Sequence, residues 1–285
     1  MKFIPPRVDY RKLRFNNLNT EFKHLWSLLY WIAYGIGFAI VEAVFANPEQ
    51  CKYKIYWHAV DSRIPFLEIF VIPYLMWFAF LFLTHVYTLL YDLDLYKKLI
   101  KYIMVTYTTA LLIFILFPNT FAMPDGTSLR PTDLNRDNFL YKFMLYFWEH
   151  TDTPTNVCPS LHVVGTLACT FTIFHSKRLT NVPFRIFIVI ISIAICVSTV
   201  FLKQHSVIDV IVALPISFIA EIICFRPHLF KRKKRNLAGA VDGEPSTLAE
   251  IAPTEITPVS ENVENNETTE SPDIVETQEN VSTDA

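Results

Sequence analysis

Residues 66–91 read FLEIFVIPYLMWFAFLFLTHVYTLLY, and this run decides the class of fold. It exceeds the roughly 20 mostly apolar residues that a helix needs to cross the hydrocarbon layer of a membrane. A second run of the same kind, HLWSLLYWIAYGIGFAIVEAVF, occupies 24–45. Only helices and closed barrels satisfy their backbone hydrogen bonds in hydrocarbon, and long unbroken apolar runs are typical of helices. The two runs therefore predict a helical membrane protein.

Four further apolar runs extend this prediction. Two lie at 99–118 and 184–202, and two weaker ones, at 160–175 and 206–225, contain ionisable side chains. A hydrophobic fraction of 52% and a mean hydropathy of +0.30 set the chain apart from ordinary soluble domains. We expect an all-α fold, a polytopic membrane protein with a six-transmembrane-helix bundle and a disordered C-terminal tail.

The distribution of Lys and Arg predicts the orientation of the bundle. With a cytoplasmic N-terminus, the segments on the inner side carry 18 of the 25 Lys and Arg residues, and those on the outer side carry 7. Cytoplasmic loops of membrane proteins show such an excess of positive charge. We therefore expect an integral, multi-pass protein of the plasma (inner) membrane with both termini in the cytoplasm.

Composition divides the chain into three parts. These are a basic cytoplasmic N-terminal segment (1–23), a six-helix membrane domain (24–230), and a basic anchor, KRKKR, with an acidic tail (231–285). Residues 236–285 hold twelve Asp and Glu and no Lys, Arg or aromatic residue, so they lack the apolar side chains that would offset chain entropy. The tail is predicted to be disordered, with a cytoplasmic protein as its candidate partner. No nucleic-acid motif is present, and no nucleic-acid partner is expected.

The five cysteines are too scattered for a disulfide framework or a zinc site. We expect neither a metal nor a cofactor. Cys51 and Cys158 fall in predicted outer loops, so a disulfide between them is one alternative, and two free thiols in local packing are the other. The remaining cysteines lie in predicted spans, where small apolar packing is their expected role.

Candidate chemistry gathers on the predicted outer face. Three separate stretches lie there: Arg130-Pro131, PSLH at 159–162, and STVFLKQHSVID at 198–209. The last contains His205 and Asp209, which are four residues apart and would share one face of a helix. A carboxylate in that position can hold an imidazole in one tautomer. The arrangement indicates a histidine prepared for nucleophilic attack.

These residue types suit phosphoryl transfer. His205 is the candidate nucleophile, Asp209 would orient it, and His162 would act as general acid and then as general base. Guanidinium, ammonium and hydroxyl groups stabilise charge on phosphate oxygens. The candidate substrate-binding residues of this kind are Arg130, Ser160, Ser198, Thr199 and Lys203.

The three stretches together resemble the type 2 phosphatidic acid phosphatase superfamily. Its motifs are Lys-x6-Arg-Pro, Pro-Ser-Gly-His and Ser-Arg-x5-His-x3-Asp, and the spacing of the third is kept between Ser198 and Asp209. The resemblance covers about 60–226. It implies a six-helix membrane bundle, a reaction without metal, a phosphohistidine at His205, and His162 as the acid.

Three positions depart from the family motifs. Met123 stands where the first motif has Lys, Leu161 replaces Gly, and Thr199 replaces the Arg of the third motif. Two phosphate-binding cations are therefore missing. The Lys-Gln before His205 is similar to a branch of the superfamily that includes inositol phosphorylceramide synthases, and Lys203 would supply part of the lost charge.

Three functions are compatible with these patterns. The leading one is a membrane lipid phosphate phosphatase, a hydrolase that acts on an amphiphilic phosphomonoester or pyrophosphate at the outer membrane face. The first alternative is a lipid phosphotransferase that passes a phospho-headgroup to a second alcohol. The second alternative is a non-catalytic membrane scaffold whose tail binds a partner. A phosphotransferase would form its product only when an acceptor alcohol is present. A scaffold would keep its function when His205 is replaced.

Other ionisable residues in or near spans are interpreted as structural. Glu42, Glu68, His85 and Glu221 are expected to form hydrogen bonds with neighbouring helices rather than to belong to the site. The aromatic segment 138–150 is expected to form an amphipathic element at the outer interface, beside the site.

Overall fold

The computed structural model describes residues 8–123, 125–127, 129–130, 138–150, 153–226 and 229. These residues all belong to the first of two compact units, Met1–Leu237. The basic run 231–235 and the acidic tail 236–285, for which an anchor and disorder are predicted, lie outside the described residues, as does Pro131.

Helices dominate the described residues. The α-helices are α1 (Leu29–Val44), α2 (His58–Asp61), α3 (Val71–Tyr91), α4 (Leu93–Leu116), α5 (Phe139–His150), α6 (Leu161–His175), α7 (Val182–Phe201) and α8 (Val207–Phe225). Short 3-10 helices cover Tyr10–Lys12, Phe15–Asn17, Lys23–Leu28, Pro48–Gln50 and Glu68–Phe70. Two short strands, β1 (Tyr53–Lys54) and β2 (Asn119–Thr120), pair in parallel, with Tyr53 opposite Asn119. The segment 138–150, for which an amphipathic element is predicted, contains the helix α5.

Within the described ranges, five helical segments are long and apolar enough to cross a membrane. They are Lys23–Val44, Glu68–Tyr91, Leu93–Leu116, Val182–Phe201 and Val207–Phe225. Their outward faces expose large apolar side chains, among them Phe82, which is 67% exposed, as expected of surfaces that face hydrocarbon. The prediction of a helical, membrane-embedded protein is therefore supported. A sixth helix, α6, has only 15 residues and does not reach that length.

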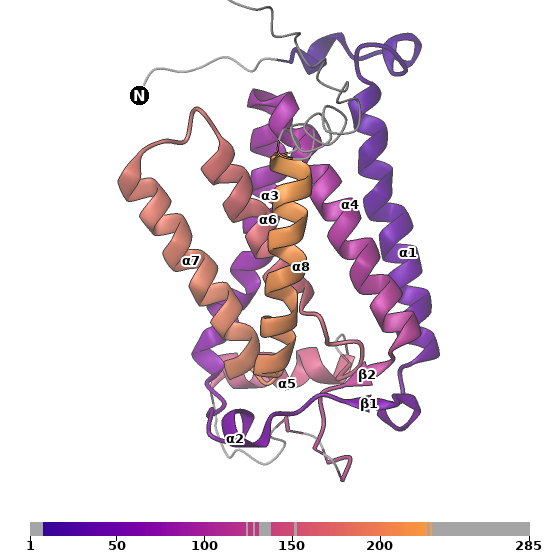
Figure 1. Ribbon diagram of the computed structural model, residues 1–285, viewed down its shortest axis with the longest axis vertical. Coiled ribbons are helices and arrows are strands. Elements are labelled where there is room, and N and C mark those ends of the chain that lie inside the picture. Colours follow the sequence, from indigo (N-terminus) through magenta and orange to yellow (C-terminus); the bar gives the residue numbers. More distant parts are fainter. Residues whose placement is uncertain are drawn as a thin grey trace, which may run out of the picture. The chain divides into compact units, whose positions relative to one another are not determined.

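The short helix α6 lies inside the bundle, where it packs against α3, α4, α7 and α8 (Figure 1). Its residues Val163, Val164, Ala168 and Cys169 are fully buried. Non-helical backbone at membrane depth is tolerated where protein, rather than lipid, surrounds it. This enclosure explains how α6 can be shorter than the helices around it.

A glycine brings α6 close to two neighbouring helices. A Cβ atom placed on Gly165 would lie 2.6 Å from the Tyr107 hydroxyl of α4 and 2.9 Å from the Trp77 indole nitrogen of α3. Both distances are far below ordinary van der Waals contact. Any larger residue at Gly165 would therefore force the Tyr107 and Trp77 side chains to move.

One end of the bundle carries a cap. Figure 1 shows α2, α5, β1 and β2 gathered at the end where α8 begins. The buried carboxamide of Asn119 holds the approach to α6, because its Oδ1 accepts from the backbone N–H groups of Val157 and Cys158, both at 2.9 Å. Its Nδ2 donates to the Cys158 carbonyl at 3.1 Å. The residues that precede α6 are thus fixed by a residue from β2.

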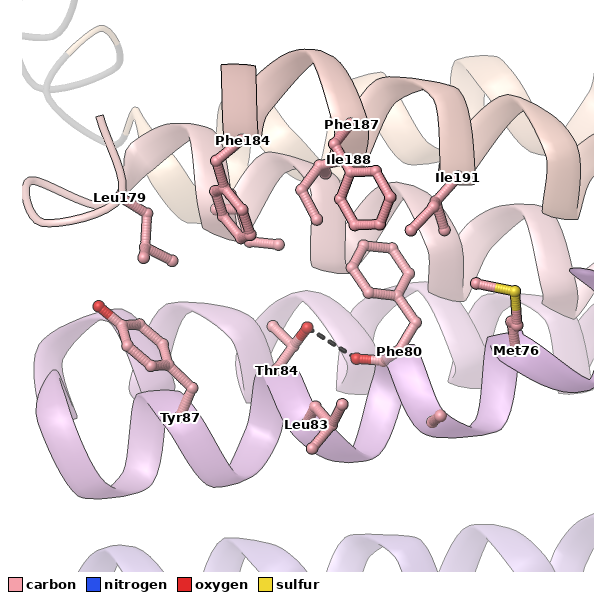
Figure 2. Close-up of a pocket in the computed structure, with 12 residues that line it drawn as sticks. Met76, Phe80, Leu83, Thr84, Tyr87, Leu179, Phe184, Phe187, Ile188 and Ile191 are labelled. Carbon is pink, nitrogen blue, oxygen red and sulfur yellow. Dashed lines mark hydrogen bonds between the residues drawn. The ribbon is translucent and has the colours of Figure 1, made fainter. Parts of the chain in front are cut away.

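An apolar groove of about 340 Å³ lies between α3 and α7 (Figure 2). Its lining includes Met76, Phe80, Phe187 and Ile191. Of its lining residues, Thr84 and Tyr87 carry hydroxyls, and that of Thr84 donates to the Phe80 carbonyl at 2.7 Å. The groove therefore presents almost no polar group, and the candidate chemistry lies elsewhere.

Candidate active site

A cavity of about 490 Å³ lies near the capped end of the bundle. Side chains from α1, α3, α5 and α6, and from the segments that precede α6 and α8, form its walls. They are Phe38, Ala39, Glu42, Tyr74, Trp77, Phe78, Phe147, Thr153, Thr155, Asn156, Val157, Leu161, His162, Gln204 and His205. Two of the sequence-predicted catalytic residues, His162 and His205, thus line one cavity.

Asp209 holds the ring of His205 from behind. The His205 Nδ1 atom lies 3.1 Å from Asp209 Oδ2, and Asp209 is fully buried. The same carboxylate oxygen accepts from the backbone N–H of Ser206 at 3.0 Å, as part of a capping box at the start of α8. With the proton on Nδ1 donated to the carboxylate, Nε2 of His205 keeps its lone pair. His205 itself precedes the helix, since Ser206 is the N-cap.

Cys158 is a buried residue whose thiol is influenced by the charge of Asp209. Burial, and next to it the charge of the Asp209 carboxylate, raises the pKa of Cys158. Cys158 and Cys51 are both buried, free thiols. The structure thus has the second alternative, two free thiols, and not a disulfide between them.

His162 lies in the first turn of α6 with its ring packed against aromatic side chains. The ring stacks on Tyr74 at 4.3 Å and lies 4.4 Å from Trp77, measured between ring centroids. Its Nε2 atom is buried and has no hydrogen-bond partner among the described residues. The rings of His162 and His205 are 6.2 Å apart and inclined at 62°. A proton-carrying imidazole can therefore lie opposite a nucleophilic one.

Ser160 connects the starts of two helices rather than lining the cavity. It is the N-cap residue of α6, and its backbone N–H donates to the Asp209 carbonyl at 3.3 Å. Its hydroxyl is buried and has no partner within the described part of the chain. Ser160 thus joins the start of α6, which carries His162, to the start of α8.

Ser198 and Thr199 differ from their expected role as phosphate donors. Their hydroxyls donate within α7, to the carbonyls of Ile195 at 2.6 Å and Cys196 at 2.8 Å, and neither residue lines the cavity. Thr199 acts instead through its backbone carbonyl, which accepts from the N–H groups of Gln204 at 2.9 Å and His205 at 3.1 Å. This turn ends α7 and positions His205.

Lys203 also differs from its expected role. Its ammonium donates to the carbonyls of Asp61 at 2.9 Å and Ile64 at 2.6 Å, and the residue does not line the cavity. Burial lowers the pKa of Lys203, an effect that the Asp61 charge opposes. With a φ of 54°, Lys203 also occupies the left-handed region that turns α7 into α8. Lys203 therefore fastens the segment after α2 to this turn.

Arg130 reaches the wall of the cavity. Its Nη2 atom donates to Gln204 Oε1 at 3.0 Å and to the Thr153 carbonyl at 3.2 Å, and its guanidinium carbon lies 5.6 Å from the centre of the Trp148 ring. Gln204 and Thr153 both line the cavity. Arg130 and Lys203 are the cationic residues predicted to bind phosphate. Of the two, Arg130 is the one that contacts residues lining the cavity of His162 and His205.

Asp61 is a functional candidate that motif reasoning missed. This buried carboxylate accepts from the Ser206 hydroxyl at 2.6 Å and from the backbone N–H of Val207 at 3.0 Å, at the positive end of the α8 dipole. The backbone N–H of Trp57 also donates to it, at 2.7 Å. No motif in the sequence marks Asp61, because its partners in α8, Ser206 and Val207, are 145 and 146 residues away along the chain.

Glu42 was expected to be purely structural, yet it lines the cavity from α1. Its carboxylate accepts from Asn156 Nδ2 at 2.7 Å and from the Thr153 hydroxyl. Only its position inside a predicted span could have marked it, since ionisable residues there are by default functional candidates.

The apolar helices and the histidine cavity define a class: a helical membrane protein with a paired-histidine site at one end of its bundle. Among the described residues, no group of three or more His, Cys, Asp or Glu side chains is arranged to hold a metal ion. Comparison with protein-family models, curated proteins and solved structures found no match.

Proposed function

We propose that the protein is a membrane lipid phosphate phosphatase, similar to the type 2 phosphatidic acid phosphatases, that hydrolyses an amphiphilic phosphomonoester or pyrophosphate. The observation that carries the proposal is one cavity lined by two imidazoles, with the buried Asp209 behind His205. This is the set that nucleophilic attack, orientation and proton transfer require. No metal takes part in the proposed reaction.

In the first step, Nε2 of His205 attacks the phosphorus atom. An N–P bond forms, the P–O bond to the alcohol breaks, and protonated His162 gives its proton to the departing oxygen. Asp209 stabilises the positive charge that develops on His205, from Oδ2 at 3.1 Å. The product of this step is a phosphohistidine, and the alcohol leaves.

In the second step, a water molecule attacks the phosphohistidine. Neutral His162 takes a proton from the water as the O–P bond forms, and the N–P bond breaks. Phosphate leaves, and both histidines return to their starting states. The same residue therefore serves as acid and then as base, as reversibility of the mechanism requires.

Arg130 and Gln204 are the proposed phosphate donors. Gln204 is 2% exposed, lines the cavity, and has an Nε2 atom without a hydrogen-bond partner among the described residues. Its Oε1 accepts from Arg130, so the free end of the amide is the donor end. Ser160, which does not line the cavity, joins the starts of α6 and α8, and the contacts of Ser198, Thr199 and Lys203 likewise assign these residues to positioning.

A lipid substrate agrees with the apolar walls. Phe38 and Ala39 of α1 and Trp77 and Phe78 of α3 contribute apolar surface to the cavity beside the polar groups. In the proposed topology α6 counts as a sixth span, enclosed by other helices, and both termini are cytoplasmic. The excess of Lys and Arg on that side supports this orientation. The cavity then faces the outer side of the plasma membrane.

Phosphotransfer between lipids is the second candidate, and Glu42 favours it. A phosphomonoester carries nearly two negative charges at neutral pH, and a phosphodiester carries one. A carboxylate in the cavity wall and the loss of two motif cations, at Met123 and Thr199, both disfavour the more highly charged ester. In this reaction an alcohol replaces water in the second step.

Phosphate release from a panel of lipid phosphates, in the presence of a chelator, tests the proposal. The samples are detergent-purified wild type, His205→Ala, and His58→Ala as a control histidine that is exposed on α2. Chelator-resistant release that His205→Ala abolishes and His58→Ala keeps is the expected result. Release that His205→Ala leaves unchanged overturns it. A new phosphodiester formed only with an added acceptor lipid would establish phosphotransfer instead.

A further inference from the structure

The polar groups of the cavity divide into two walls of opposite hydrogen-bonding character. The donor wall comprises Gln204, through its Nε2 atom, and the Arg130 guanidinium behind it. The acceptor wall comprises Glu42, Asn156 and Thr155, all of which line the cavity. Phosphate oxygens need donors, so they belong on the first wall. The second wall requires a different ligand.

The acceptor wall is built around one carboxylate. Glu42 accepts from Asn156 Nδ2 at 2.7 Å, and the Thr153 hydroxyl, which also donates to Glu42, lies 2.9 Å from the Thr155 hydroxyl. Because its nitrogen is bound to Glu42, the Asn156 amide has a defined orientation. Its oxygen has no partner among the described residues, although Asn156 is only 5% exposed. A buried acceptor without a hydrogen bond lowers the stability of the folded protein, unless a ligand donates a hydrogen bond to it.

The backbone holds this wall in place. Asn156 has a φ of 53°, in the left-handed region that Asn tolerates better than most residues. Its N–H donates to the Asn119 carbonyl at 2.7 Å, and Thr155 forms a bridge with Thr120. The acceptor groups are therefore fixed by β2 before any ligand arrives.

We propose that the acceptor wall is a subsite for the alcohol part of the substrate, and that this alcohol carries hydroxyl or ammonium donors. Carboxylate and amide oxygens accept protons and offer none, so they suit such groups. The inference rests on the second candidate of the proposed function, phosphotransfer, with the phosphoryl group bound between His162 and His205. The substrate class is then a phosphodiester, a phospholipid with a donor-bearing headgroup.

A headgroup with a quaternary ammonium fits less well. Such a cation has no proton to donate, and it is usually bound by a cage of aromatic faces. The cavity ring of Tyr74 is instead stacked on His162, and the ring of Trp77 packs against His162 at a tilt of 40°. Hydroxyl and ammonium headgroups share the donor chemistry that Glu42 and Asn156 recognise, and the experiment separates them.

Turnover of four lipids with identical acyl chains tests the subsite. Phosphatidylglycerol offers hydroxyls, phosphatidylethanolamine offers an ammonium, phosphatidylcholine offers no donor, and phosphatidic acid has no headgroup alcohol. The full-length protein is compared with Glu42→Gln, with Glu42→Asp, which keeps the carboxylate, and with Glu68→Gln. The last is a matched control, since Glu68 accepts from Asn138 outside the cavity.

We expect the wild type to prefer at least one of the two donor-bearing lipids over phosphatidylcholine. Glu42→Gln should lower kcat/KM for that lipid by roughly tenfold, the effect of one lost hydrogen bond to a charged group. Glu42→Asp should lose less kcat/KM than Glu42→Gln, and Glu68→Gln should leave kcat/KM unchanged. The comparison of phosphatidylglycerol with phosphatidylethanolamine then shows whether the headgroup donor is a hydroxyl or an ammonium. An equal loss on all four lipids in Glu42→Gln would overturn the subsite.

A binding measurement separates failure of the subsite from failure of the proposed function. If none of the three lipids with a headgroup is turned over, retention of phosphatidylglycerol, phosphatidylethanolamine and phosphatidylcholine is compared by native mass spectrometry. Preferential retention of a donor-bearing lipid that is lost in Glu42→Gln supports the subsite without any catalysis. Equal retention of the three lipids by the wild type overturns it.

Discussion

The rings of His162 and His205 lie 6.2 Å apart across one cavity, although α6 and α7 separate them along the chain. The start of α6 and the start of α8 bring them together, and the hydrogen bond from Ser160 N–H to the Asp209 carbonyl joins these two starts. Changes at the junction of α6 and α8 should therefore affect catalysis before they affect the bundle.

Asp209→Asn should reduce activity by about two to four orders of magnitude while the fold survives. An amide can still accept from Ser206 N–H, but it no longer selects the tautomer of His205 or stabilises its positive charge. Initial rates and thermal unfolding of the same preparation check this. A variant with near wild-type rates would show that the orientation of His205 does not depend on the carboxylate.

Gly165→Ala should destabilise the bundle by about 1–3 kcal/mol, the usual cost of overpacking. The added Cβ would lie 2.6 Å from the Tyr107 hydroxyl. Unfolding is followed in mixed micelles with increasing denaturant, and Gly35→Ala serves as control because a Cβ there meets nothing within 4 Å. Adding Tyr107→Phe should recover part of the loss. Equal stability of Gly165→Ala and Gly35→Ala would contradict the close packing of α6.

Lys203→Met should lower stability by about 1–3 kcal/mol, because the carbonyls of Asp61 and Ile64 lose their donor. The control is Lys97→Met, which removes only an exposed ion pair with Asp94. The KM for a lipid phosphate should change little among molecules that remain folded. A large rise in KM at unchanged stability would instead indicate that Lys203 binds the phosphate group of the substrate.

The stabilising effect of Lys203 should grow as pH rises towards 10.5, the ordinary pKa of Lys. Burial lowers the pKa of Lys203 in the folded state, so in the window below 10.5 the unfolded chain binds more protons than the folded chain. Stability rises with pH wherever this holds. The difference in unfolding free energy between wild type and Lys203→Met should therefore widen at alkaline pH. A difference that narrows would contradict the direction of the shift.

Cys158 should react slowly with maleimide at pH 8 in the folded protein and quickly after denaturation in SDS. Burial and the Asp209 carboxylate raise its pKa, and the thiolate is the reactive form. A variant that keeps only Cys51 and Cys158 should show two reactive thiols in SDS without reductant. Thiols that appear only after reduction would indicate the disulfide.

Much of the fold could be predicted from apolar runs alone, since each run of about 20 residues implies a helix. The weak run at 160–175 does form a helix, α6, but its 15 residues fall short of a span, because a helix enclosed by protein need not match the thickness of the membrane. The spacing between His205 and Asp209 identified their pairing, and that pair is present at 3.1 Å. This contact joins residues only four positions apart, so the sequence spacing alone was enough to predict it.

Other parts of the site depend on contacts that spacing does not encode. The hydroxyls of Ser198 and Thr199 bond to their own helix, a choice that residue type alone does not decide. Asp61 and Glu42 reach the site from segments far from the motifs. Lys203 lies next to the motif residues, yet the turn at the end of α7 directs it towards Asp61 and Ile64.

The most direct test of the central claim is to trap the phosphohistidine. A lipid analogue whose aryl leaving group needs no proton is mixed with His162→Ala, which lacks the base for the second step, and the reaction is stopped in alkali. Peptide mass spectrometry should then find one phosphoryl group on His205 of that variant, and none in a parallel reaction with the double variant His162→Ala, His205→Ala. A phosphoryl group on another residue, or turnover of the analogue by the double variant at the rate of His162→Ala, would contradict His205 as the nucleophile.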